Sequence, residues 1–96
     1  MPYENLFKKY FGAEYSYAMK VAKAESGLRA NAHNYNPKTK DNSYGLMQIN
    51  IYGSLAKSRP SGEWLLNPEN NIAYAKQLRD SSGWNCWSTV KNGKVK

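Results

Sequence analysis

Apolar side chains recur at helical spacing near the start of the chain. They occupy the i, i+3, i+4, i+7 and i+8 positions of one face, namely Tyr3, Leu6, Phe7, Tyr10 and Phe11. Gly12 follows and favours a stop. The pattern predicts a short amphipathic helix over 3–11. A second helix is predicted over 13–26, where Gly27 provides the next stop.

The clearest helix start lies in the second half of the chain. Asn67 is a favourable cap, Pro68 fits the first helical position, and Glu69 complements the helix dipole. A helix is therefore predicted over 68–80, ending before Ser82-Gly83. Its buried face is expected to carry Ile72, Ala75 and Leu78.

The remaining segments are short or polar. Residues 29–43 are rich in Asn and predict a long loop with at most a vestigial β-hairpin. Residues 44–56 are apolar with a glycine near each end, which predicts a tight turn that enters a short helix. Residues 58–64 are expected to be loop, and the basic tail from about 90 is expected to be loose. The pattern predicts an α-rich fold.

Length and charge narrow the possibilities. A chain of 96 residues predicts one domain over 1–96, with a small core. Fourteen Lys and Arg against seven Asp and Glu give a net charge of +7, which favours a polyanionic partner such as an anionic cell envelope or nucleic acid. No apolar stretch predicts a membrane span or a signal peptide. The single cysteine, Cys86, excludes an internal disulfide.

One carboxylate falls on the apolar face of the second predicted helix. Ala18, Val21, Ala22 and Glu25 lie at i, i+3, i+4 and i+7. Burial and the negative end of the helix dipole both disfavour the charged form of Glu25, so both raise its pKa. A carboxyl that stays protonated near neutral pH suits a general acid for glycoside cleavage. The alternative is a partly exposed glutamate that ends the helix and pairs with a lysine.

Four motifs follow one another in a specific order. They are ESGL at 25–28, SYGLMQIN at 43–50, NPENNIAYAKQL at 67–78 and GWNCWS at 83–88. In these motifs the chain resembles the lysozyme-like family of soluble lytic transglycosylase domains, over roughly residues 13–90. The resemblance implies an α-rich, α+β lysozyme-like fold with a catalytic cleft. It also implies cleavage of peptidoglycan glycan strands at the β-1,4 bond between MurNAc and GlcNAc.

The resemblance carries site residues with it. Glu25 is implied as the catalytic acid, and the substrate-binding residues are expected to be Ser26, Ser43, Tyr44, Gly45, Met47, Gln48, Asn50 and Tyr74, with Leu46 beside them. The side chains of Gln48 and Asn50 each carry a donor and an acceptor, as a grip on N-acetyl and hydroxyl groups requires. Met47 fits a core position equally well. Trp84 and Trp87 are expected to pack in the core rather than face the sugar.

The second motif departs from the pattern of true lysozymes. These often carry an aspartate directly before Tyr-Gly, where this chain has Ser43, and the nearest carboxylate is Asp41. The resemblance then implies a transglycosylase, in which one glutamate acts first as acid and then as base and leaves 1,6-anhydro-MurNAc ends. The alternative is a two-acid lysozyme that uses Asp41. The polar loop predicted at 38–43 has few apolar anchors, so we expect Asp41 to be dispensable.

Two other classes of function compete with an enzyme. One is a sugar-binding module on the same fold, and the other is a basic domain that stacks nucleic-acid bases on Tyr and Trp. The nucleic-acid class explains neither Glu25 nor the ordered motifs. No cofactor is implied and no metal-ligand spacing exists; His33 is expected to be a solvated loop residue and Cys86 a buried small hydrophobe. We expect a monomer that acts on the cell wall, in the periplasm, outside the cell, or delivered by a phage.

Overall fold

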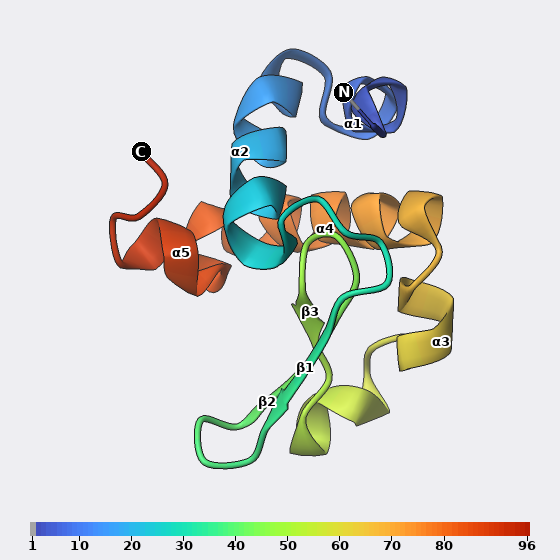
Figure 1. Cartoon of the computed structure of the whole chain (residues 1–96), viewed down its shortest axis with the longest axis vertical. Helices are drawn as coiled ribbons and strands as arrows, with labels where there is room; N and C mark the ends of the chain where they lie inside the picture. Colours follow the sequence, from blue (N-terminus) through green and yellow to red (C-terminus); the bar gives the residue numbers. More distant parts are fainter. Residues whose placement is uncertain (1) are drawn as a thin grey trace.

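The computed structural model describes residues 2–96, so Met1 of the expected domain lies outside the described residues. Helix α1 (Glu4–Phe11) packs against α2 (Tyr15–Ser26) and α4 (Pro68–Ser82), and α5 (Ser88–Lys91) lies against α2. Figure 1 shows these helices on one side of the molecule, with the sheet and the short α3 (Gly62–Leu65) on the other side. Single turns of 3-10 helix cover Gly12–Glu14 and Trp84–Cys86. The predicted α-rich lysozyme-like fold class is confirmed.

The apolar stripes of the sequence form the core. Ala18, Val21 and Ala22 of α2 are fully buried, as are Ile72 and Ala75 of α4, while Leu78 is only partly buried. Phe7 and Phe11 of α1 complete the helical part of this core. Because these positions follow a 3.6-residue period, their burial also fixes the phase of each helix and therefore where Glu25 points.

Helix α4 begins as the sequence predicts. The side chain of Asn67 accepts a hydrogen bond from the backbone N–H of Asn70 at 3.1 Å, and Pro68 occupies the first turn. The helix ends at Ser82, two residues later than expected, and Gly83 follows with φ of +76°. Helix α2 begins at Tyr15, two residues later than expected, because the chain first makes the 3-10 turn.

The middle of the chain contains more strand than the sequence predicts. The expected loop at 29–43 holds β1 (His33–Asn36) and most of β2 (Asp41–Tyr44), which pair antiparallel. The tight turn at 45–48 is confirmed, but β3 (Ile49–Asn50) follows it and pairs with β2, and a 3-10 helix comes only at Gly53–Lys57. The expected loop at 58–64 contains most of α3. Sequence analysis under-predicts β1 and β2 because neither of these polar strands alternates clearly between apolar and polar residues.

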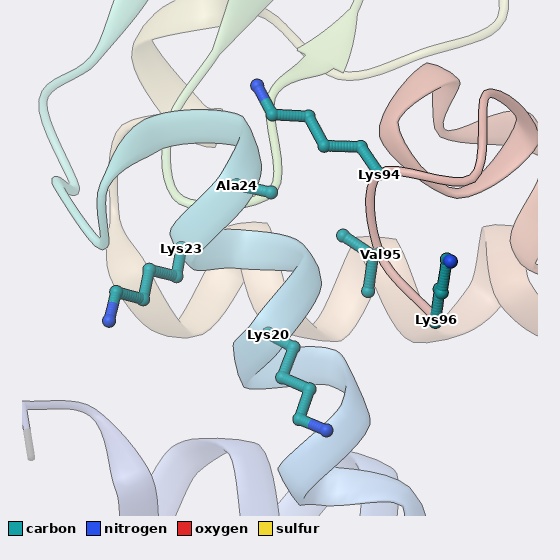
Figure 2. A pocket seen from close by; sticks show the side chains of 6 residues that line it. All are labelled: Lys20, Lys23, Ala24, Lys94, Val95 and Lys96. Atoms are coloured by element: carbon teal, nitrogen blue, oxygen red, sulfur yellow. The ribbon is translucent and has the colours of Figure 1, made fainter.

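The C-terminal tail packs against the body of the protein. Val95 is buried among the core residues, and its backbone N–H donates to the carbonyl of Thr89 at 2.9 Å. The apolar Val95 side chain anchors a segment that is otherwise basic and that was expected to be loose. This contact brings the tail alongside α2, where the exposed Lys94 and Lys96 line a groove (Figure 2).

A buried amide connects the turn at 45–48 to α4. Asn71 of α4 is fully buried, and its Oδ1 accepts from the N–H of Met47 at 2.8 Å. Its Nδ2 donates to the carbonyls of Tyr44 and Leu65 at 2.8 and 2.9 Å. Gly45, with φ of +79°, lies so close that a Cβ there would collide with this amide. Asn71 therefore satisfies three backbone groups, two of them through fully buried hydrogen bonds.

We expect Asn71→Ala to lower the free energy of unfolding by about 2–4 kcal/mol, because it leaves three buried backbone groups without partners. Urea denaturation measures the change. Asn85→Ala is the matched control, because Asn85 is exposed, and it should leave the denaturation midpoint unchanged. Equal midpoints for the two variants would contradict the structural role of Asn71.

Candidate active site

Glu25 lies in the last turn of α2, where the helical part of the molecule meets the sheet. Its half-buried side chain lines a polar pocket of 380 Å³. The pocket is also lined by residues of β1, β2, the turn and the start of α5: Asn34, Tyr35, Asn36, Thr39, Asp41, Ser43, Gln48 and Ser88. Gly27, with φ of +67°, ends the helix directly after Glu25 and lets the chain leave the pocket.

The sheet presents a row of polar side chains to this pocket. Asn34 pairs with Ser43 across the two strands, and Asn36 pairs with Asp41. Because alternate residues of a strand share a face, these four side chains lie on one face of the ribbon. All four line the pocket with Glu25. Amide, hydroxyl and carboxylate groups in one row match the hydroxyl and N-acetyl groups of an amino sugar.

Burial acts on Glu25 as its place in the sequence predicts. Loss of water raises the pKa of its carboxyl above the ordinary range, and the negative charge of Asp41 raises the pKa further. Hydrogen bonds from Thr89 and the positive charge of Lys94 act in the opposite direction. The net direction is upward, so the protonated form persists to higher pH than in an exposed glutamate. None of the ion pairs among residues 2–96 involves Glu25. The structure therefore does not show the alternative of a glutamate paired with a lysine.

Thr89 orients the carboxyl. Its Oγ1 donates to Glu25 Oε2 at 2.7 Å, across 64 positions of sequence. Thr89 lies in the first turn of α5, and α5 itself packs against α2. Both the hydroxyl and the backbone of Thr89 act on the carboxyl, so one residue of α5 orients the acid.

Asp41 is held more firmly than the sequence predicts. It begins β2, pairs with Asn36, and its Oδ2 accepts a hydrogen bond from Thr39 Oγ1 at 2.7 Å. The expectation of a weakly held loop at 38–43 is therefore wrong. Backbone pairing with β1, rather than apolar anchors, holds the segment. Asp41 thus lines the same pocket as Glu25.

Gln48 lines the pocket and also builds its wall. Its Nε2 donates to the carbonyls of Ala32 and Gly45 at 3.2 and 2.9 Å, and its Oε1 accepts from Asn34 Nδ2 at 2.7 Å. With φ of +49° it occupies the left-handed region in the turn. Its amide therefore orients Asn34 toward the pocket and fixes the turn.

Several residues implied by the resemblance lie behind the pocket. Ser26 is buried, and its Oγ donates to the carbonyls of Ala22 and Leu46. Leu46 and Met47 are fully buried in the core. Gly45 lies against Asn71 and Leu65. None of these four is among the residues that line the pocket, and each shapes it from behind.

Tyr44, Asn50 and Tyr74 also lie away from the pocket lining. The Tyr44 ring stacks on His33, with centroids 4.0 Å apart. Asn50 accepts from the backbone N–H groups of Asn42 and Tyr52, so it holds β2 and β3 together. Tyr74, on α4, packs partly buried against the core.

The tryptophans and the cysteine complete the comparison with the sequence. Trp87 is buried and its Nε1 donates to the carbonyl of Met47 at 2.7 Å, while Trp84 stacks on Phe11, so both serve packing as expected. Cys86 is exposed, so the expectation of a buried cysteine is wrong. The 3-10 turn directs Trp87 inward and leaves the neighbouring Cys86 outside.

Sequence reasoning missed five residues of the pocket and its principal hydrogen-bond donor. The missed lining residues are Asn34, Tyr35, Asn36, Thr39 and Ser88, and the donor is Thr89. A turn at Pro37-Lys38 with a short polar segment on each side is typical of a β-hairpin. This pattern could have indicated the strand residues. No local signal marks Thr89, because its role depends on a contact with a distant helix.

Residues 2–96 contain no cluster of three or more His, Cys, Asp or Glu side chains that could hold a metal ion. No helix within this range has the length and apolar character needed to cross a membrane.

Comparison with known families adds an independent line of evidence. The family model described as "Lysozyme like domain" matches residues 10–89, a range that includes Glu25 and every other residue lining the pocket. Comparisons with curated proteins and with solved structures found no match. Such domains indicate a glycosidic activity related to peptidoglycan. The fold, the half-buried acid at the end of α2 and this match agree, and the chain belongs to the lysozyme-like domain family.

Proposed function

We propose that the protein cleaves peptidoglycan glycan strands at the β-1,4 bond between MurNAc and GlcNAc, with Glu25 as the catalytic acid. The observation that carries the proposal is a half-buried carboxyl of raised pKa, oriented by one hydroxyl, at the edge of a pocket lined by polar side chains. General acid catalysis requires a proton donor of this kind. The protein would act as a monomer where peptidoglycan lies, in the periplasm or outside the cell.

The proposed reaction uses Glu25 twice. Glu25 first gives its proton to the glycosidic oxygen, and the bond between this oxygen and C1 of MurNAc breaks. The resulting carboxylate then takes the proton of the MurNAc 6-hydroxyl, whose oxygen bonds to C1. The products are a new 4-hydroxyl on GlcNAc and a 1,6-anhydro-MurNAc end, and Glu25 is protonated again. No water is consumed, so the cleft needs only one acid.

The position of Asp41 supports a second outcome of the same cleavage. A carboxylate held on β2 beside the same pocket can activate water or attack C1, which would give a reducing end. In the anhydro reaction Asp41 would act only through its charge, by keeping Glu25 protonated. The two outcomes give different products, and only the hydrolysis requires the Asp41 carboxylate.

We expect Glu25→Gln to lower the rate of wall cleavage by roughly 10²–10⁴-fold, because it removes the transferable proton. Release of soluble muropeptides from purified peptidoglycan measures the rate. If the wild type cleaves peptidoglycan and the folded variant only binds it, the protein is not a simple binding module. Cleavage by the variant at the wild-type rate would reject Glu25 as the acid.

The same variant should be more stable than the wild type near neutral pH. A carboxyl whose pKa is raised by folding releases its proton more readily in the unfolded chain, so its ionisation favours unfolding as pH rises above the unfolded value of about 4.3. The advantage of Gln should therefore disappear below about pH 4. Urea denaturation at both pH values measures it.

We expect Asp41→Asn to retain most of the activity and to leave anhydro products dominant. Loss of the Asp41 charge should lower the pKa of Glu25, so the alkaline limb of the pH–rate profile should move to lower pH. Mass spectrometry of the released muropeptides identifies the ends. Reducing-end products from the wild type that vanish in this variant would establish the two-acid hydrolase instead.

Thr89→Val should move the same limb in the opposite direction. The substitution keeps the shape of the side chain but removes the donor that stabilises the Glu25 carboxylate, so the pKa of Glu25 rises. The pH dependence of kcat/KM measures both shifts. Shifts of the same sign in Thr89→Val and Asp41→Asn would contradict the proposed environment of Glu25.

A further inference from the structure

A second concave surface lies beside the pocket of Glu25 and has the opposite electrostatic character. It is an open groove of 510 Å³ between α2 and the C-terminal tail, lined by Lys20, Lys23, Ala24, Lys94, Val95 and Lys96. We name this surface the lysine groove. Figure 2 shows Lys20 and Ala24 on α2 facing the tail, with Val95 turned toward the helix and Lys94 extending along the end of α2. Lys23 points away from the tail on the other side of α2.

All the charged side chains that line this groove are lysines. The ion pairs formed among residues 2–96 involve Lys8, Lys9, Lys76 and Arg79, and none involves a lysine of the groove. No carboxylate side chain is among the lining residues. Like charges gathered around one concavity repel one another and create a positive potential, so an anionic ligand in the groove would relieve this repulsion.

The shape of the groove is held by specific contacts. Its floor is apolar, formed by Ala24 and by Val95, which is itself buried against the core. The backbone N–H of Val95 donates to the carbonyl of Thr89, which fixes the tail at this distance from α2. An apolar floor beside lysine side chains suits a ligand that carries small apolar side chains together with free carboxylates, such as a short acidic peptide.

The groove adjoins the pocket of Glu25. Ala24 lines the groove and its neighbour Glu25 lines the pocket. Thr89 connects the two sites, because its hydroxyl binds Glu25 while its carbonyl holds Val95. Lys94 is close enough to act on the titration of Glu25. A polymer bound in the pocket would therefore have a side branch within reach of the groove.

We propose that the lysine groove binds the carboxylates of the peptide stem carried by muramic acid, while the glycan lies in the pocket of Glu25. This inference rests on the proposed function, because it places the glycan at Glu25. In peptidoglycan the stem is attached to the sugar ring itself, so strand and stem reach two adjoining sites together. Binding at both sites raises the effective concentration of each group at its own site.

The test uses Lys20→Gln/Lys96→Gln, which removes two charges from the groove and leaves Lys94 and the titration of Glu25 in place. The matched control is Lys38→Gln/Lys57→Gln, since both of these lysines are exposed and line neither site. Each protein is tested on peptidoglycan freed of phosphate polymers, before and after an amidase removes the peptide stems. Cleavage is measured at low and at high salt, and binding is measured by sedimentation in the Glu25→Gln background.

On stem-bearing glycan at low salt, we expect the groove variant to bind and cleave roughly two- to thirtyfold less well than the control, as two exposed charge contacts allow. High salt should reduce the difference. On stem-free glycan the two variants should be equal. Equal behaviour on stem-bearing glycan, or an equal loss on both substrates, would overturn the proposal.

Two further binding measurements test whether another ligand occupies the lysine groove. If the groove variant loses binding only on walls that retain phosphate polymers, or only to an oligonucleotide, the peptide stem is excluded as the occupant. The outcome is also separable from the proposed function. If the wild type cleaves nothing while stem-dependent binding still falls in the groove variant, the proposed cleavage fails and the groove assignment stands.

Discussion

The site depends on one buried side-chain amide, that of Asn71. This amide gives both of its polar ends to the backbone around the turn at 45–48, and so it fastens the sheet to α4. The turn closes a backbone hydrogen bond from Gln48 to Gly45, but the N–H of Met47 depends on a side-chain partner, and leaving a buried N–H unpaired is costly. With the amide in place, Leu46 and Met47 enter the core while Gln48 remains at the pocket. The polar row of β1 and β2 then faces the end of α2.

Glu25 is an example of a carboxyl on which opposing effects act at once. Burial and Asp41 favour its neutral form, whereas Thr89 and Lys94 favour its anion. A group that must give a proton and then take one back benefits from neighbours that stabilise each of its two forms. The arrangement needs elements from three parts of the chain: the end of α2, the strand β2 and the start of α5.

The parts of this structure that sequence predicts are those with local causes. The phases of α2 and α4 follow from their apolar stripes, and the start of α4 follows from Asn67 and Pro68. The position of Glu25 on the apolar face follows from the stripe of α2. The sequence indicated at most a vestigial hairpin where three strands form, because hydrogen bonds between polar segments leave no hydrophobic period. For the same reason Asp41 was expected to be weakly held. Thr89 and the packing of Val95 depend on contacts between distant segments, which no local pattern encodes.

The bond between Glu25 and Thr89 has a consequence for the order of events during synthesis. The two residues are 64 positions apart, so α2, the sheet and α4 are all synthesised before Thr89. Helix α2, the sheet and α4 precede it and can pack earlier, with the Glu25 carboxyl still lacking its hydroxyl donor. The environment of the carboxyl is therefore completed only when α5 docks. If Glu25 is the acid that we propose, a chain that has made α2, the sheet and α4 but not yet α5 would hold this acid without its oriented donor.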